Sequence, residues 1–488
     1  MSRANPNIRL LYAVFSILET LLFGGLFFGW GVLVYILKDE GIFENLCPID
    51  RHLHNETLDS DSPKSTQNHT FGSSTQECAE RDAMFSLVFT VDSTLLNVLM
   101  AIQGLFNFHY GTEKTRILSH VQFICGTLMI AFTSTSVPWL IFPGLLLMGL
   151  AGYFHLLTNL QFSSLFSKGR FIVFGLLNGA FDSSLSVLQL IKFGHETGVS
   201  RQQSFIIYTT CYLLTLINTF CFLPKMFISK IEHKEITTVC QSEDQQNNEQ
   251  NPPLPGRLSS KDKSDKTNHS QSLKRYLCSS TYITHLIWYS ILLLQYLFYI
   301  NTFNIMLERI FDDNEDKVSH YTSSFAYFQI AGCVNSTLAG VLYMKTTQRF
   351  AKCNSELRRK LMPNVAPMIV TTLVSMLLTV SVMLGTEWSL YISFYIISVF
   401  RAFFFTLSSG FVSALYPPRF FTMLHGVMTL IGGAFSLLQY ALVQWVEEGG
   451  LLRVNIAMIT FTVLSLVHPA SLWFKVWRHE EIYQLQSH

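Results

Sequence analysis

The stretch Phe171-Ile-Val-Phe-Gly-Leu-Leu-Asn-Gly-Ala-Phe-Asp-Ser-Ser-Leu-Ser-Val-Leu-Gln-Leu-Ile191 decides the fold class of this chain. It is apolar and long enough to cross a bilayer as one helix, which needs about 20 residues. Asp182 nevertheless lies near its middle, where a charge costs at least ~2.5 kcal/mol on insertion scales and therefore faces protein or water. At helical spacing, one polar stripe follows this helix through Asn178, Asp182, Ser186 and Gln189. Such a stripe is typical of a carrier.

The composition supports a membrane protein. Of 488 residues, 49% are hydrophobic and 14% are charged, whereas charged residues make up about a quarter of soluble proteins. The net charge is +1, so nothing in the charge balance indicates nucleic-acid binding. We expect an all-α protein in the lipid bilayer.

Twelve apolar segments are long enough to be membrane spans, six on each side of a polar segment. They cover 10–37, 84–106, 117–134, 138–160, 171–192, 203–223, 280–306, 321–344, 363–385, 388–414, 420–446 and 452–474. We predict an N-terminal six-helix bundle over 1–223 and a C-terminal one over 280–474. The polar segment 224–279 lacks the hydrophobicity to form a core, so we predict a largely disordered linker. Residues 475–488 form a tail.

The distribution of Lys and Arg predicts the orientation. The linker, the loop after span 8 and the loops between spans 2 and 3 and spans 4 and 5 are basic, as at Lys114, Arg116, Lys168 and Arg170. All these loops fall on one side of a twelve-span topology. By the positive-inside rule this side is the cytosol, so both termini, the linker and the tail are expected there. We expect the plasma membrane as the location.

The loop 38–83 then lies outside the cell. It contains glycosylation sequons at Asn55 and Asn68, together with Cys47 and Cys78. We predict that both sequons are glycosylated and that the two cysteines form a disulfide, with two free thiols as the alternative. Two further sequons, at Asn268 and Asn335, fall in the cytosol and inside span 8, so they should be unused.

Ionisable residues inside predicted spans include Glu19, Asp92, Asp182 and Arg401. They could line a midplane cavity, or Arg401 could pair with Glu19 or Asp182 merely to neutralise buried charge. In span 7, Trp288, Gln295, Tyr299 and Thr302 share one helical face, which we interpret as cavity lining. For His285 and His425 we expect hydrogen-bonded core or interface residues.

Motifs of energy coupling and catalysis are absent from the sequence. It has no Gly-x-x-x-x-Gly-Lys-Ser/Thr phosphate loop, no His-Glu-x-x-His motif and no nucleophile elbow. The remaining cysteines lack metal-ligand spacing. We therefore expect no enzyme, no metal and no cofactor.

Several stretches resemble solute carrier family 43 of the major facilitator superfamily. Leu176-Leu-Asn-Gly-Ala-Phe-Asp-Ser-Ser184 is similar to the fifth-span signature of the nucleobase-transporting branch of this family. Further similarities are the surroundings of Glu19, the segment Leu157-Thr-Asn-Leu-Gln161, the start of span 7 at His285 and the surroundings of Arg401. They extend over nearly the whole chain except the linker.

The resemblance implies two six-helix bundles around a central cavity. It also implies sodium-independent, facilitated transport of purine nucleobases such as adenine, guanine and hypoxanthine, by a carrier that we expect to be a monomer. A planar neutral base suits aromatic walls and amide or carboxylate groups at its edges. Candidate substrate-binding residues are Asn178, Asp182, Gln295, Tyr299, Arg401, Glu19 and Asn159.

The sequence also departs from the superfamily pattern. Major facilitators carry Gly-x-x-x-Asp-Arg between spans 2 and 3, but here Phe108 stands at the acid's position and His109 at the arginine's. The equivalent segment after span 8 has Met344 in place of the acid. Loss of both acids should bias or loosen the conformational equilibrium. Two alternatives therefore stay open: a carrier of large neutral amino acids, and a transport-silent paralogue that acts as a membrane scaffold or regulator.

Overall fold

The structure is a computed structural model that describes residues 6–47, 79–166, 169–222, 273–311, 315–446 and 450–486. Regular structure in these residues is helical, apart from one isolated bridge between Ser134 and Val137. The all-α prediction is therefore confirmed.

Ten helices in the described part of the chain are long and apolar enough to cross a membrane. They are Asn7–Asp39, Ala83–Phe132, Pro138–Leu165, Arg170–Glu196, Arg201–Cys221, Ser280–Phe303, Glu356–Met383, Glu387–Leu415, Pro418–Trp445 and Leu451–Arg478.

Two places differ from the twelve predicted spans. Helix α3 (Ala79–Phe132) has 54 residues and would extend for about 80 Å, far more than a bilayer is thick. Gly111 interrupts it with φ 82° and ψ 179°, a conformation that glycine adopts readily. Its two arms hold the predicted spans 84–106 and 117–134. The predicted span 321–344 falls on α12 (Glu315–Ile330) and α13 (Gly332–Phe350), which are not among the ten because they are more polar.

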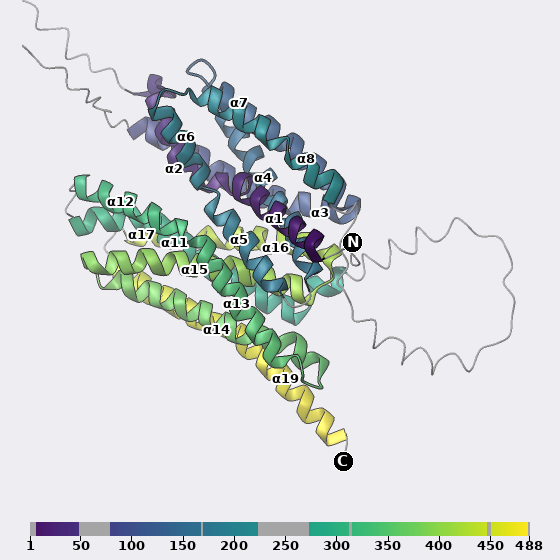
Figure 1. The fold of residues 1–488 in the computed structure, drawn as a ribbon. Coiled ribbons are helices and arrows are strands. Elements are labelled where there is room, and N and C mark those ends of the chain that lie inside the picture. Colours follow the sequence, from purple (N-terminus) through teal and green to yellow (C-terminus); the bar gives the residue numbers. More distant parts are fainter. Residues whose placement is uncertain are drawn as a thin grey trace, which may run out of the picture.

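The helices form two groups that follow the two halves of the sequence (Figure 1). Besides α3, the first group holds α1 (Pro6–Phe23), η1 (Leu26–Gly29), α2 (Trp30–Asp39), α4 (Ile141–Asn159), η5 (Leu160–Leu165), α5 (Arg170–Ser183), α6 (Ser186–Glu196), α7 (Arg201–Tyr212), α8 (Thr215–Ile217) and η6 (Asn218–Phe222). Besides α12 and α13, the second holds α11 (Ser280–Phe311), α14 (Glu356–Met383), α15 (Glu387–Leu415), α16 (Pro418–Ser436), α17 (Leu438–Trp445), α18 (Leu451–Ser465) and α19 (Val467–Gln486).

Local sequence signals set several helix boundaries. Gly385, with φ 59°, follows the end of α14. Thr386 then caps α15, since its hydroxyl accepts from the Ser389 N–H while the Ser389 hydroxyl accepts from the Thr386 N–H. Ser200 and Gln203 form the same reciprocal cap at the start of α7.

The two groups meet along two seams, α5 against α13 and α3 against α16. Glycines permit both close approaches. A Cβ added at Gly175 of α5 would lie 2.5 Å from the carbonyl oxygen of Ser336, and one added at Gly104 of α3 would lie 2.8 Å from that of Thr422. The backbones of the two halves therefore touch where any larger side chain would separate them.

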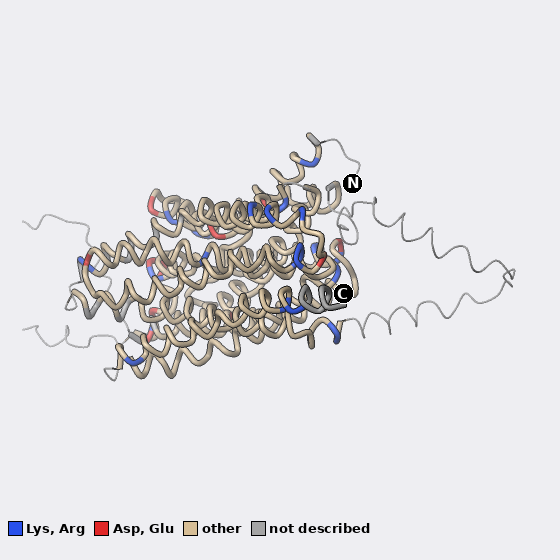
Figure 2. Tube along the Cα trace, turned by 90° about the horizontal axis from the view of Figure 1, so that it is seen from below, with Lys and Arg blue, Asp and Glu red and all other residues tan. Residues whose placement is uncertain are grey.

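The first described helix begins, and the last one ends, at the same end of the bundle (Figure 1). Figure 2 shows Lys and Arg gathered more densely toward this end than along the rest of the helices.

Phe108, where major facilitators carry an acid, contacts α16 through its ring. The guanidinium carbon of Arg419 lies 4.9 Å from the ring centroid, and the Phe420 ring lies at 5.2 Å. The neighbouring Asn107 donates to the Thr422 hydroxyl at 2.6 Å. An aromatic ring beside a cation thus occupies the place where major facilitators carry the acid.

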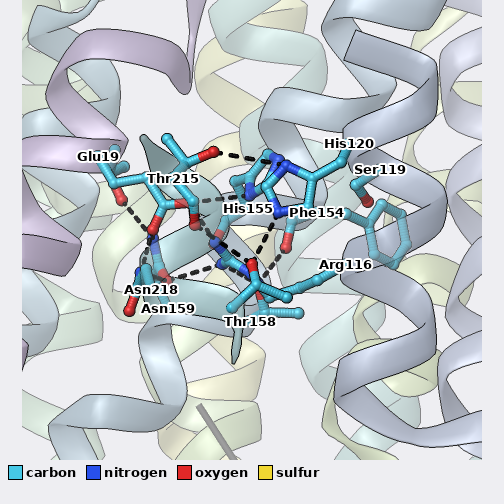
Figure 3. Close-up of polar contacts among 12 residues, drawn as sticks. Glu19, Arg116, Ser119, His120, Phe154, His155, Thr158, Asn159, Thr215 and Asn218 are labelled. Atoms are coloured by element: carbon cyan, nitrogen blue, oxygen red, sulfur yellow. Dashed lines mark hydrogen bonds and ion pairs between the residues drawn. The ribbon is translucent and has the colours of Figure 1, made fainter. Parts of the chain in front are cut away.

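Within the first group, a fully buried charge network joins four elements (Figure 3). Arg116, in the second arm of α3, forms an ion pair with Glu19 of α1. Its guanidinium also donates to Thr219 at 2.9 Å, Thr158 at 3.0 Å and the Asn159 carbonyl at 2.9 Å. Each of the three guanidinium nitrogens therefore donates to at least one acceptor, as a charge buried in a membrane requires.

The Glu19 carboxylate is equally surrounded. It accepts from the amides of Asn159, at 3.2 Å, and Asn218, and the Nδ1 atom of His155 lies 3.2 Å away. Tyr212 extends the network, because its hydroxyl bonds ring nitrogens of both His120 and His155. The network fixes α1, α3, α4 and η6 relative to one another, and it thereby positions the wall of the cavity described below.

Removing one partner of this pair should destabilise the protein. Loss of a single member of a buried ion pair typically costs about 3–5 kcal/mol, because the other charge is left uncompensated. We expect Arg116→Met to lower the melting temperature of the detergent-purified protein, and Glu19→Gln combined with Arg116→Met to recover part of this loss.

The matched control is Lys360→Met, which removes an exposed pair with Glu356 and should leave the melting temperature nearly unchanged. An Arg116→Met protein that melts like the control would show that the network does not hold the bundle together.

Candidate functional site

The polar residues of the fifth predicted span differ in burial along its length. Asn178 and Asp182 lie one turn apart on α5 and are both buried. The helix breaks after Ser183, where the Ser184 hydroxyl accepts from the Gly25 N–H at 2.6 Å. Beyond the break, Gln189 is exposed on α6. The predicted stripe therefore does not stay buried along its whole length, because Gln189 at its far end is exposed.

A cavity lies between the two groups of helices. Residues of the first group line one side: Phe28, Tyr153, Leu156, Leu157, Leu160, Asn178, Phe181 and Asp182. Residues of α15 and α16 line the other: Arg401, Phe405, Ser409 and His425. Its volume of about 30 Å³ is enough for one or two water molecules. A larger ligand therefore requires the two sides to move apart.

An ion pair crosses this cavity. The Arg401 guanidinium donates to Asp182 Oδ1 at 2.9 Å, and the two side chains are only 8% and 7% exposed. Ser336 of α13 reaches the other carboxylate oxygen at 3.5 Å. The Arg401 guanidinium carbon also lies 5.5 Å from the centre of the Phe28 ring. Of the two pairings considered from the sequence, Arg401 thus forms the one with Asp182.

Aromatic rings form much of the remaining wall. Phe181 packs edge-on against Tyr153, with centroids 5.5 Å apart, and against Phe28 at 6.0 Å. Phe405 lies on the opposite side, edge-on to Tyr296 at 5.8 Å. Flat apolar faces beside a few polar groups are typical of small-molecule sites.

Four of the predicted binding residues lie elsewhere. Glu19 and Asn159 belong to the buried network of the first group (Figure 3). Gln295 donates to Thr379 at 2.5 Å, and the Tyr299 hydroxyl bonds Ser393 at 3.0 Å. The polar face of α11 therefore meets α14 and α15, not the cavity. The interpretation of this face as cavity lining stays a prediction, because in this structure other helices supply the polar neighbours that the stripe requires.

The structure places two residues, Arg116 and His425, in surroundings that differ from those predicted from the sequence. Arg116, assigned to a loop, is fully buried, because the second arm of α3 begins after Gly111 and includes Arg116. Its helical spacing to His120 and Thr127 could have revealed a polar face. His425, expected to be a hydrogen-bonded core or interface residue, lines the cavity, and its Nδ1 atom has no hydrogen-bond partner.

Some predicted sites fall outside the described residues. These are Asn55, Asn68, Asn268 and Cys78, so glycosylation and the disulfide from Cys47 stay predictions. Asn335 is buried in α13 and donates to Ser398 at 3.2 Å, as an unused sequon should. In the part of the chain that the structure describes, no cluster of three metal-ligating side chains occurs.

Comparisons with known proteins identify relatives along nearly the whole chain. No family model matches it. The chain is 27% identical to equilibrative nucleobase transporter 1 of Bos taurus, with 94% of this chain and 95% of the relative covered. It is 23% identical to the large neutral amino acids transporter small subunit 3 of Homo sapiens, with 94% and 92% covered.

Two solved structures share the fold. The human organic anion transporter MFSD10 (TETRAN) matches with a TM-score of 0.53 and 13% identity, over 96% of this chain and all of that one. A bacterial homologue of the iron transporter ferroportin, in an outward-facing state, matches with a TM-score of 0.53 and 9% identity, over 94% and 99%. All four relatives are transporters and none is an enzyme. The chain is thus a multi-pass membrane protein with the major facilitator fold, and it resembles the transporters of solute carrier family 43.

Proposed function

We propose that this protein is a facilitative, sodium-independent carrier of purine nucleobases that works by alternating access. One observation carries the proposal. Of the residues that line the cavity, the two charged ones, Asp182 and Arg401, are paired with each other. The site therefore presents no net charge to a ligand.

A purine base suits such a site. It is planar and neutral, so its faces can stack on the rings of Phe28, Tyr153, Phe181 and Phe405. Its edges carry hydrogen-bond donors and acceptors, which Asn178 and the outer atoms of the ion pair can match. The resemblance to a nucleobase transporter, at 27% identity, agrees with this chemistry.

Large neutral amino acids are the second candidate. An amino acid carries a carboxylate and an ammonium, which Arg401 and Asp182 could bind only after their own ion pair opens. Opening a buried pair leaves two charges to be compensated by the ligand alone, which is costly. The 23% identity to a large neutral amino acid transporter keeps this candidate in the test below.

The proposal includes a topology. Twelve spans cross the plasma membrane in two bundles, 1–223 and 280–474, with the arms of α3 counted separately and α12–α13 counted as one span. Both termini, the linker 224–279 and the tail 475–488 lie in the cytosol, and the glycosylated, disulfide-linked loop 38–83 lies outside. The clustering of Lys and Arg at the end where the described chain starts and finishes supports this orientation (Figure 2). The carrier works as a monomer and uses no cofactor.

Adenine uptake into cells that express the chain tests the substrate. We expect saturable uptake of radiolabelled adenine that excess guanine inhibits, excess leucine leaves unchanged, and replacement of sodium does not alter. Inhibition by leucine would favour the amino-acid carrier. Absence of uptake by glycosylated protein at the surface would favour a scaffold or regulatory role.

Variants of the cavity test the site. Asp182→Ala leaves Arg401 unpaired at the ligand's place, so we expect at least a ~10-fold loss of adenine uptake, about 1.4 kcal/mol or more, for the same amount of protein at the surface. The matched control is Gln189→Ala. Gln189 belongs to the same polar stripe in the sequence but is exposed, so this variant should keep full uptake. Normal uptake by Asp182→Ala would remove this residue from the site.

A further inference from the structure

We propose that His425 is a specificity-determining residue that binds a ring nitrogen of the purine through its imidazole. This inference rests on the proposed nucleobase transport. It adds a contact between the edge of the base and a residue of the C-terminal half. It stands on the placement of His425, on its unsatisfied nitrogen and on comparison with the other buried histidines.

His425 is held at the cavity by its backbone. The side chain is only 3% exposed and lines the cavity from α16. A Cβ at the next residue, Gly426, would lie 2.9 Å from the Cα atom of Ala101, so α16 is pressed against α3 at this position. The helix cannot rotate to take the imidazole elsewhere without losing this contact.

Aromatic rings surround the imidazole of His425, and they leave its Nδ1 atom without a hydrogen bond to the described residues. The centroid of the Tyr153 ring lies 6.0 Å away, and that of Phe421 lies at 5.9 Å. The Nδ1 atom is buried without a hydrogen-bond partner in the described residues. A buried polar atom left unpaired is costly, and a bound ligand that pairs with it removes that cost.

Three other buried histidines, His120, His285 and His468, differ in this respect. His120 bonds the Tyr212 hydroxyl at 2.9 Å and the Thr219 hydroxyl at 2.7 Å. His285 and His468 bond each other at 3.2 Å, and their other ring nitrogens meet a Ser408 carbonyl and a Thr284 hydroxyl. These rings have polar partners of the protein on both nitrogens, whereas the Nδ1 atom of His425, a side chain that lines the cavity, has none in the described residues.

The chemistry fits a purine edge. A neutral imidazole has one donor and one acceptor nitrogen, and either tautomer can form. A purine edge likewise alternates ring nitrogens that accept with N–H groups that donate. The side chain of leucine or phenylalanine has neither, so an unpaired imidazole selects against it. His425 from α16 and Asn178 from α5 would hold the base from opposite halves of the protein.

Competition by purine analogues tests the contact directly. The labelled substrate is adenine, and the competitors are 1-deaza-, 3-deaza- and 7-deazaadenine, each of which replaces one ring nitrogen with C–H. In the wild type, we expect one of the three to compete at least ~10-fold more weakly than adenine. In His425→Phe, adenine itself should bind at least ~10-fold more weakly, with a higher KM and nearly unchanged maximal rate, and the discrimination against that analogue should disappear.

Two further variants keep the result interpretable. His425→Gln retains a donor and an acceptor, so it should keep the KM for adenine within about threefold and serves as the conservative control for His425→Phe. His109→Gln alters an exposed histidine whose hydrogen bond in the described residues is to the Leu105 carbonyl of its own helix, and it should behave like the wild type.

The outcomes separate the two proposals. A wild type that transports no purine overturns the proposed function and this inference with it. A wild type that transports adenine but does not discriminate among the three analogues, or a His425→Phe variant that keeps the KM for adenine and the ranking of the analogues, overturns the role of His425 alone.

Discussion

The ion pair between Asp182 and Arg401 is the interaction on which the rest of the arrangement depends. Neither charge is stable alone inside a bilayer, so each requires the other from the opposite half of the protein. The seam of α5 against α13 brings the halves close enough for this, and Ser336 on that seam adds a second contact to the carboxylate. Any motion that separates the halves at the cavity must supply these charges with new partners.

A second buried ion pair, between Glu19 and Arg116, lies within one half of the protein and does not join the two halves. Its members and their partners all belong to the first group of helices, and they are fully buried (Figure 3). It can therefore remain intact while the two halves move as rigid units. The protein thus combines one charge network that stabilises a half with one ion pair that joins the halves, and only the second borders the cavity.

The sequence predicted part of this arrangement. A charge inside an apolar run must face protein, so Asp182, Asn178 and Arg401 could be predicted to point inward, and all three line one cavity. Hydropathy does not say which neighbour a polar face meets. Gln295 and Tyr299 show this, since their partners are threonine and serine residues on adjacent helices. Their roles in binding stay predictions without support from this geometry. Phe108 shows a different limit, because its contact with Arg419 depends on two spans far apart in the sequence.

The central claim is that a purine crosses the membrane through this cavity, and counterflow in proteoliposomes tests it most directly. Vesicles containing the purified protein are loaded with unlabelled adenine, guanine or leucine and diluted into a trace of labelled adenine. A facilitative purine carrier should accumulate the label transiently in vesicles loaded with adenine or guanine, and not in those loaded with leucine. Accumulation driven by leucine, or none with any load, would contradict the account.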